Sequence, residues 1–140
     1  MNTTTAEIES TETQSGTRIL TRGVGAALMV GVAYIHWLDL PGKMAEVPYL
    51  GYMYIALIIG SLLSVGLLFY KPRAGWTLGG ALALGSIIAF CLNRTVGLPY
   101  AMDDIGNWGE PLGVASLVVE GVMVVLSATM LRFRSKVLSE

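Results

Sequence analysis

Residues 112–131 read LGVASLVVEGVMVVLSATML, an apolar run in which Glu120 is the single charged side chain. At 1.5 Å of rise per residue, about 20 helical residues cross the ~30 Å hydrocarbon core of a bilayer. Apolar stretches of similar length occur at 19–40, 49–70 and 76–92. None of them alternates polar and apolar residues over the length of a barrel strand. The sequence therefore predicts an all-α fold, an integral membrane bundle of four transmembrane helices.

The composition supports this class and excludes several others. Of the 140 residues, 54% are hydrophobic and 14% are charged, whereas soluble domains carry about 25% charged residues. The net charge of −1 indicates no basic surface for nucleic acid. The apolar composition makes the lipid bilayer the expected partner. The single cysteine, Cys91, excludes an internal disulfide and a CxxC pair. The single histidine, His36, excludes a haem held by two histidines of this chain.

The domain boundaries follow from polarity and helix-breaking residues. Residues 1–17 are rich in Thr, Ser and Glu, and they predict a disordered cytoplasmic tail. The four-helix transmembrane domain is expected over 18–134, and a second short cytoplasmic tail over 135–140. Prolines lie at or near the expected helix ends: Pro41, Pro48, Pro72, Pro99 and Pro111.

The basic residues predict the orientation. Seven of them flank the two termini and the connection near residue 72, and two lie on the other side. By the positive-inside rule, both termini are expected in the cytoplasm of a bacterium, with the protein in its inner membrane. The 94–111 connection is then expected outside. Tyr70 and Trp76 are expected in the aromatic belt at the inner interface.

Small residues predict close helix packing around the third span. Gly75 and Gly79, and likewise Ala81 and Gly85, are separated by four positions, a spacing that lets helix backbones approach in lipid. The contact is expected either within the bundle or between copies in a homo-oligomer.

Among the residues of the four spans, Glu120 has the highest expected free-energy cost of burial in the membrane, because its carboxylate can carry a charge. It lies eight residues beyond Leu112, so about 12 Å below the outer boundary along the helix axis. Because an isolated charge at that depth is unfavourable, we expect a partner, and Arg94 at the outer end of the third span is the expected one. The pair either locks two helices together, anchors an anionic ligand or gates a proton.

His36 and Asp39 are one helical turn apart near the outer end of the first span. Asp39 is expected to orient the imidazole, and His36 is either an interfacial histidine bonded to a loop carbonyl or a ligand, metal or proton-relay group. Ser116 shares the face of Glu120, and Asn93 adjoins Arg94. These polar groups are expected to converge on one outward-facing pocket that binds a ligand or relays a proton: His36, Asp39, Asn93, Arg94, Ser116 and Glu120.

The outer connection RTVGLPYAMDDIGNWGEPLG, 94–113, predicts a shaped lid loop because it is rich in Gly and Pro. Its candidate residues are Asp103, Asp104, Trp108 and Glu110. These carboxylates lack EF-hand spacing, so no metal site is predicted, and the sequence identifies no cofactor.

One segment carries a resemblance. NRTVGLP followed by DDIGNWGEPLGVASLVVEG, within 93–121, is similar to a pattern in uncharacterised four-helix bacterial membrane proteins of actinobacterial type, which implies the four-helix fold but no activity. Size and topology also resemble the small multidrug-resistance exporters in architecture alone. That family carries its membrane glutamate in the first helix, where this chain has His36.

Three functions stay open on these residues. The first is a ligand-binding protein with an outward-facing polar pocket, or an accessory subunit of a larger membrane complex. The second is an oligomeric, proton-coupled small-molecule transporter that uses Glu120. The third is a membrane enzyme with His36 and Asp39 as acid and base, which no nucleophile or metal set accompanies, so no catalytic residue is assigned. Homo-oligomerisation or a membrane-protein partner is compatible with the first two.

Overall fold

The computed structural model describes the backbone of residues 3–137 and the side chains of residues 13–132. This part of the chain contains no strand. Its elements are α1 (Thr3–Glu46), α2 (Pro48–Tyr70), α3 (Pro72–Thr95), a short 3-10 helix η1 (Met102–Asp104) and α4 (Pro111–Val137). Four helices are long and apolar enough to cross a membrane. The predicted all-α bundle of four transmembrane helices is therefore confirmed.

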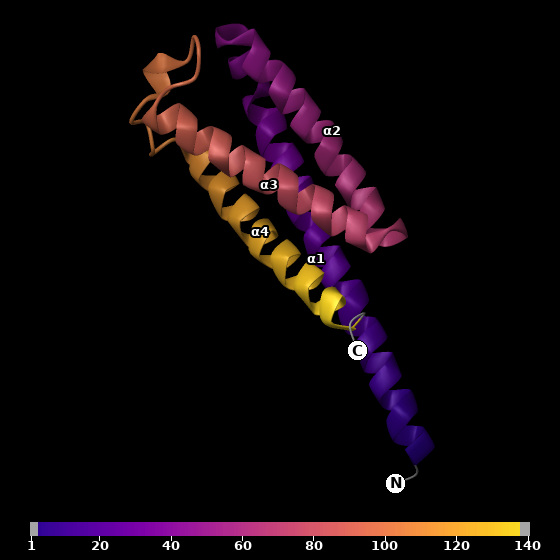
Figure 1. Cartoon of the computed structure of the whole chain (residues 1–140). Coiled ribbons are helices and arrows are strands. Elements are labelled where there is room, and N and C mark those ends of the chain that lie inside the picture. Colours follow the sequence, from indigo (N-terminus) through magenta and orange to yellow (C-terminus); the bar gives the residue numbers. More distant parts are fainter. Residues whose placement is uncertain (1–2, 138–140) are drawn as a thin grey trace.

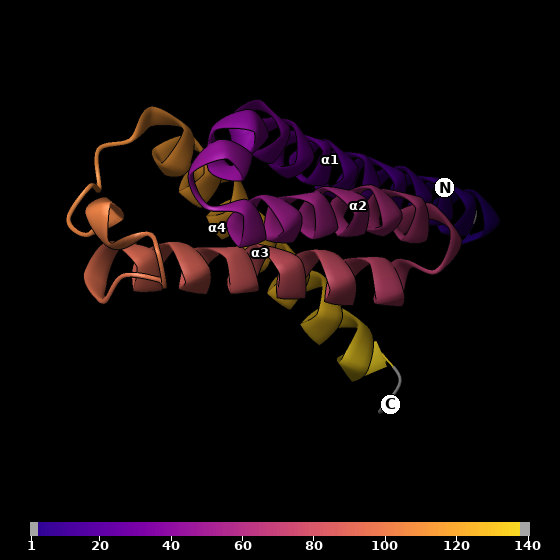
Figure 2. The same cartoon turned by 90° about the horizontal axis from the view of Figure 1, so that it is seen from above.

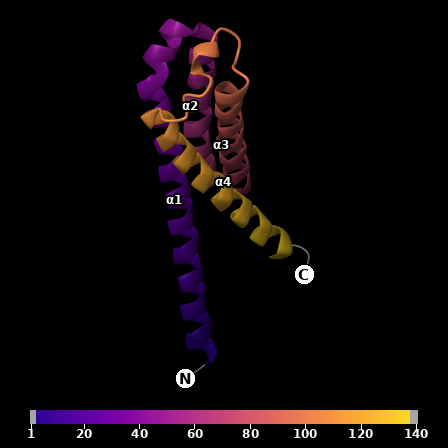
Figure 3. The same cartoon turned by 90° about the vertical axis from the view of Figure 1, so that its left-hand side faces the viewer.

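The termini and the long connection lie at opposite ends of the bundle (Figure 1). The segment between α3 and α4, drawn in orange, forms one end, and the N- and C-terminal ends of α1 and α4 point the other way. α1 extends beyond the other helices at its N-terminal end (Figures 1 and 3). α4 crosses the bundle obliquely, so that its C-terminal end diverges from the other helices (Figure 2).

Pro48 and Pro72 coincide with helix boundaries, whereas Pro41 lies inside a helix. Val47 and Lys71 precede Pro48 and Pro72 and adopt extended φ angles of −141° and −135°, because a following proline disfavours the helical conformation. α1 instead continues through Pro41 to Glu46, so the first span ends later than the predicted residue 40. Neighbouring helices make an interior proline tolerable in a membrane bundle.

The terminal segments also differ from the predicted boundaries. α1 begins at Thr3, so the segment predicted as a disordered tail, 1–17, is helical from Thr3 onward. It contains no proline, and it continues a helix that the membrane span already nucleates. α4 continues to Val137, so the predicted tail 135–140 is helical over its first three residues. Residues 1–2 and 138–140 lie outside the described part.

The half of the bundle near the termini has a packed core made of Met29, Leu68, Trp76, Ala83 and Met123. The predicted close approach at α3 is present at Gly75 and Gly79 but not at Gly85, where nothing lies within 4 Å of the position of the missing Cβ. A Cβ on Gly75 would lie 2.5 Å from the backbone nitrogen of Leu68, and a Cβ on Gly79 would meet the side chain of Met123. Only residues without a side chain let the helices pack this closely.

The expectation that Trp76 belongs to the interfacial belt is wrong. Its side chain is 3% exposed, and its ring packs against the position of Gly25. A glycine on α1 leaves a recess into which the indole fits, so burial replaces the interfacial position. Tyr70, the other residue predicted for this belt, is exposed.

Candidate functional site

A cavity of about 440 Å³ lies in the half of the bundle nearest the α3–α4 connection. This volume is within the range of small-molecule sites, about 300–1,000 Å³. All four helices contribute to its lining, and its walls are mainly apolar. The residues predicted for a polar pocket all line it, namely His36, Asp39, Asn93, Arg94, Ser116 and Glu120. Their predicted role in binding a ligand or relaying a proton stays a prediction.

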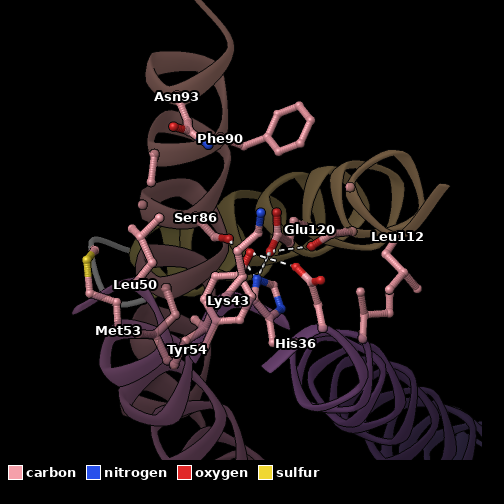
Figure 4. Close-up of a pocket in the computed structure, with 18 of the residues that line it drawn as sticks. His36, Lys43, Leu50, Met53, Tyr54, Ser86, Phe90, Asn93, Leu112 and Glu120 are labelled. Carbon is pink, nitrogen blue, oxygen red and sulfur yellow. Dashed lines mark hydrogen bonds and ion pairs between the residues drawn. The ribbon is translucent and has the colours of Figure 1, made fainter. Parts of the chain in front are cut away.

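His36, Ser86 and Glu120 meet at one end of this cavity, from α1, α3 and α4 (Figure 4). The imidazole Nδ1 lies 2.9 Å from the carbonyl oxygen of Val32. A carbonyl only accepts hydrogen bonds, so Nδ1 carries the hydrogen and the neutral ring presents Nε2 as an acceptor. Nε2 lies 3.5 Å from Ser86 Oγ and 3.9 Å from Glu120 Oε1.

Glu120 is almost fully enclosed, with 1% of its surface exposed. Ser116, one turn earlier on α4, donates its hydroxyl to Glu120 Oε1 at 2.8 Å. Met123 of the packed core lies about one turn farther along the same helix. The layer of His36 and Glu120 is therefore the floor of the cavity, directly above the close-packed core.

Asp39 has a different partner from the one predicted. The expectation that it orients His36 is wrong, because the imidazole Nδ1 bonds to the backbone of Val32. Tyr54 of α2 donates its hydroxyl to Asp39 Oδ2 at 3.1 Å. The Tyr54 ring also packs edge-on against the imidazole, with ring centroids 4.7 Å apart. Tyr54 thus connects two polar groups of α1 that do not bond to each other.

Arg94 pairs with the loop and not with Glu120, so the predicted Arg94–Glu120 pair is wrong. Its Nη1 lies 2.6 Å from Asp104 Oδ1, and its Nη2 contacts Glu110 Oε2. Nη1 also donates to the backbone carbonyl of Asp104 at 3.2 Å. Arg94 lies at the end of α3 where the connection begins, and the loop carboxylates are nearer to it than the deeper glutamate.

Asp104 is the centre of this cluster of charges, which we call the loop network: Lys43, Asn93, Arg94, Asp104 and Glu110. Besides Arg94, it accepts a hydrogen bond from Asn93 Nδ2 at 2.8 Å and pairs with Lys43 Nζ at 3.3 Å. Partial burial alone would raise the pKa of this carboxyl. The Asn93 and Arg94 hydrogen bonds and the nearby positive charges outweigh it and hold the pKa of Asp104 below its usual value.

The predicted lid loop is folded back against the bundle. Gly97 and Gly106 take positive φ angles of 81° and 80°, which glycine adopts without strain. Tyr49 donates its hydroxyl to the carbonyl of Pro99 at 2.8 Å. Trp108 packs edge-on against Phe90, with ring centroids 6.0 Å apart.

The four predicted loop residues therefore have separate positions. Glu110 reaches the cavity lining, whereas Asp103, Asp104 and Trp108 do not line it. Asp103 is exposed, and Asp104 belongs to the loop network. Whether the loop opens and closes as a lid stays a prediction.

Three polar lining residues were absent from the predicted set: Lys43, Tyr54 and Ser86. Each is a polar residue within or just beyond an apolar span. In a span, a polar side chain is usually directed toward the bundle interior, and this signal applied to every polar residue would have selected Tyr54 and Ser86. Lys43 follows Pro41, where the sequence predicts that the helix has ended.

Comparison with known proteins adds no assignment, since no protein-family model, curated protein or solved structure matches the chain. Among the described residues, no group of three or more His, Cys, Asp and Glu side chains is arranged to hold a metal ion. The geometry of the cavity therefore carries the functional argument.

Proposed function

We propose that this chain is a membrane-embedded binding protein whose cavity holds a small molecule. The observation that carries the proposal is the cavity of about 440 Å³, with mainly apolar walls and a few polar groups directed into it. Ligand sites in proteins combine these two features, because apolar walls supply affinity and a few polar groups supply orientation.

The contrast between the two halves of the bundle supports this proposal. Near the termini, glycines allow close packing around fully buried side chains such as Met29 and Met123. Near the loop, Gly85 of α3 faces the cavity, and nothing lies within 4 Å of the position of its missing Cβ. Protein interiors are normally close-packed, so a hollow in the half that also holds the polar groups of the lining favours a binding role.

We further propose that the cavity is on the outer side of the bacterial inner membrane and that both termini are cytoplasmic. The support is the excess of Lys and Arg near the two termini and at the connection near residue 72, compared with the opposite side. In this orientation a ligand reaches the cavity from outside the cell or from the outer leaflet.

The experiment is purification in mild detergent, followed by native mass spectrometry of the wild type and of Gly85→Leu. The added side chain fills free space, so the variant should fold normally and lose a bound small molecule. Gly66→Leu is the matched control, because its Cβ also meets nothing within 4 Å and it does not line the cavity. A wild-type protein that carries no small molecule and binds none from a cell extract would contradict the proposal.

Proton-coupled transport is the second candidate, supported by the enclosed Glu120 carboxyl 3.9 Å from the imidazole of His36. Both groups exchange protons, and they are the floor of the cavity. Proton flux into proteoliposomes that depends on a substrate, and that Glu120→Gln abolishes, would favour this candidate. The native mass measurement also reports whether a second copy or a partner subunit accompanies the chain.

A further inference from the structure

We infer that the cavity selects molecules with an apolar body and a cationic, amine-type head, whose positive charge is matched by Asp39 and Glu120. This inference rests on the proposed binding function and names the chemical class of the ligand. It follows from an inventory of the charges that line the cavity and of the partners that each charge already has.

The cationic side chains of the lining already have acidic partners. Lys43 Nζ lies 3.3 Å from Asp104 Oδ2 and 3.4 Å from Glu46 Oε2. Arg94 pairs with Asp104 at 2.6 Å and with Glu110. Each cation thus has two carboxylates as neighbours, and an anionic ligand would add a further negative charge to a matched cluster.

Two carboxyl groups of the lining, Asp39 and Glu120, form no such ion pair within the described part of the chain, although the charge of Lys43, one turn from Asp39 on α1, acts on Asp39 at longer range. Among the described residues, no lysine or arginine lies within ion-pair distance of Asp39 or Glu120. Asp39 accepts a hydrogen bond from the neutral Tyr54 hydroxyl, and Glu120 accepts one from the neutral Ser116 hydroxyl. In a region of low dielectric constant, a carboxylate that is not in an ion pair gains most from a bound cation.

The hydrogen-bonding pattern of the floor indicates the same head group. His36 Nε2 is an acceptor, because Nδ1 is bonded to the carbonyl of Val32. The oxygens of Asp39 and Glu120 are acceptors when ionised. A head that donates several hydrogen bonds and carries a positive charge, such as a primary ammonium, complements these three groups, whereas an ether or a carboxylate does not.

The rest of the cavity suits an apolar body. Aliphatic side chains from all four helices, and Phe90 from α3, line the space around these acceptors. Examples are Ile35 of α1, Leu57 of α2 and Leu82 of α3. Burial of apolar surface contributes roughly 25 cal/mol per Å², so the body supplies affinity and the carboxylates supply selectivity.

A buried hydrogen-bond donor of Arg94 suggests the alternative that the cavity binds an acidic ligand. Arg94 Nε has no hydrogen-bond partner and lies in a side chain that also lines the cavity. This nitrogen has almost no accessible surface, and the charge of the guanidinium is already matched by Asp104 and Glu110, so an acidic ligand would bind there only if the Arg94 side chain rearranged. A test must therefore compare heads of opposite charge on the same body.

The experiment uses 4-phenylbutylamine, 4-phenylbutanol and 4-phenylbutyrate as probes. Binding is measured by calorimetry at neutral pH with the full chain in nanodiscs of zwitterionic lipid, which avoids attraction of the probes to a charged surface. We expect the amine to bind at least about tenfold more tightly than the alcohol, since charge-assisted hydrogen bonds are stronger than neutral ones. We expect no binding of the butyrate.

Variants of Asp39 and Glu120 test whether these carboxyl groups cause the preference for the amine. Asp39→Asn and Glu120→Gln should each weaken amine binding at least about tenfold and leave alcohol binding unchanged. Asp103→Asn is the matched control, because this carboxylate is exposed and does not line the cavity, and it should change neither. If a variant fails to fold, the comparison of the three probes on the wild type decides the question alone.

The outcomes separate the inference from the function on which it rests. Equal binding of all three probes, lost in Gly85→Leu, would retain the binding cavity and overturn the selection for cations. Tighter binding of the butyrate would overturn it in favour of Arg94. Absence of binding for every probe, together with a native protein that carries no small molecule, would overturn both.

Discussion

Replacement of Arg94 by methionine tests whether the loop network holds the α3–α4 connection in place. The Arg94 side chain is 3% exposed, and its partners Asp104 and Glu110 are 19% and 24% exposed. Arg94→Met removes the positive charge but retains a long apolar side chain. Two partly buried carboxylates are then left close to each other, with Lys43 the remaining cation beside Asp104.

The exposure of the partners sets the expected magnitude. Removal of one member of a buried ion pair costs about 3–5 kcal/mol, because the other charge is left without a partner. Asp104 and Glu110 retain some contact with solvent, so we expect the lower end, about 3 kcal/mol. For a chain of this size that change corresponds to a melting temperature lowered by about 10 °C.

Thermal unfolding in detergent measures this change, with Arg73→Met as the matched control. Arg73 is an exposed arginine at the opposite end of α3, and its replacement should have little effect. Addition of Glu110→Gln to Arg94→Met should recover part of the loss, because it removes one of the uncompensated charges. The reasoning is refuted if Arg94→Met has the same melting temperature as Arg73→Met. It is also refuted if the decrease in melting temperature of the double replacement equals the sum of the decreases of the two single replacements.

Three further predictions concern acidity, packing and orientation. Because the pKa of Asp104 is lowered in the fold, the contribution of its carboxylate to stability is present at neutral pH and is lost as the pH falls below about 4. Thermal unfolding at several pH values should therefore show a smaller loss of stability in acid for Asp104→Asn than for the wild type. Gly79→Leu should lower the free energy of unfolding by about 1–3 kcal/mol through overpacking, whereas Gly66→Leu should not. In a background without the native cysteine, Asp103→Cys should react with an impermeant thiol reagent added outside intact cells, and Lys71→Cys should not; the reverse pattern refutes the orientation.

The sequence predicts the helical spans because they depend on hydrophobicity and length, which are local properties. Each expected span lies within an observed helix. The helix ends are less predictable. Pro41 and Pro48 present the same local signal, yet only Pro48 coincides with a helix boundary. Whether a proline interrupts a helix depends on packing by neighbouring helices, which composition does not contain.

The partners of the polar residues depend on how the helices are rotated and crossed. Sequence spacing places Arg94 and Glu120 in the same half of the bundle, and both line one cavity. It does not show that the connection folds back and brings Asp104 and Glu110 to Arg94. The choice of Val32 over Asp39 as the partner of His36 likewise depends on the rotamer of the imidazole.

The partners of Arg94 explain why the cavity has two electrostatic regions. Because the loop carboxylates engage Arg94, the close partners of Glu120 among the described residues are the hydroxyls of Ser86 and Ser116 and the imidazole of His36, and none of them is a lysine or arginine. Charges that form ion pairs stabilise the fold, whereas carboxyl groups outside an ion pair are available to a ligand. Changes at Arg94 should therefore affect stability more than selectivity, and changes at Asp39 or Glu120 should affect selectivity more than stability. Melting temperatures and probe affinities measured on the same set of variants distinguish these two regions.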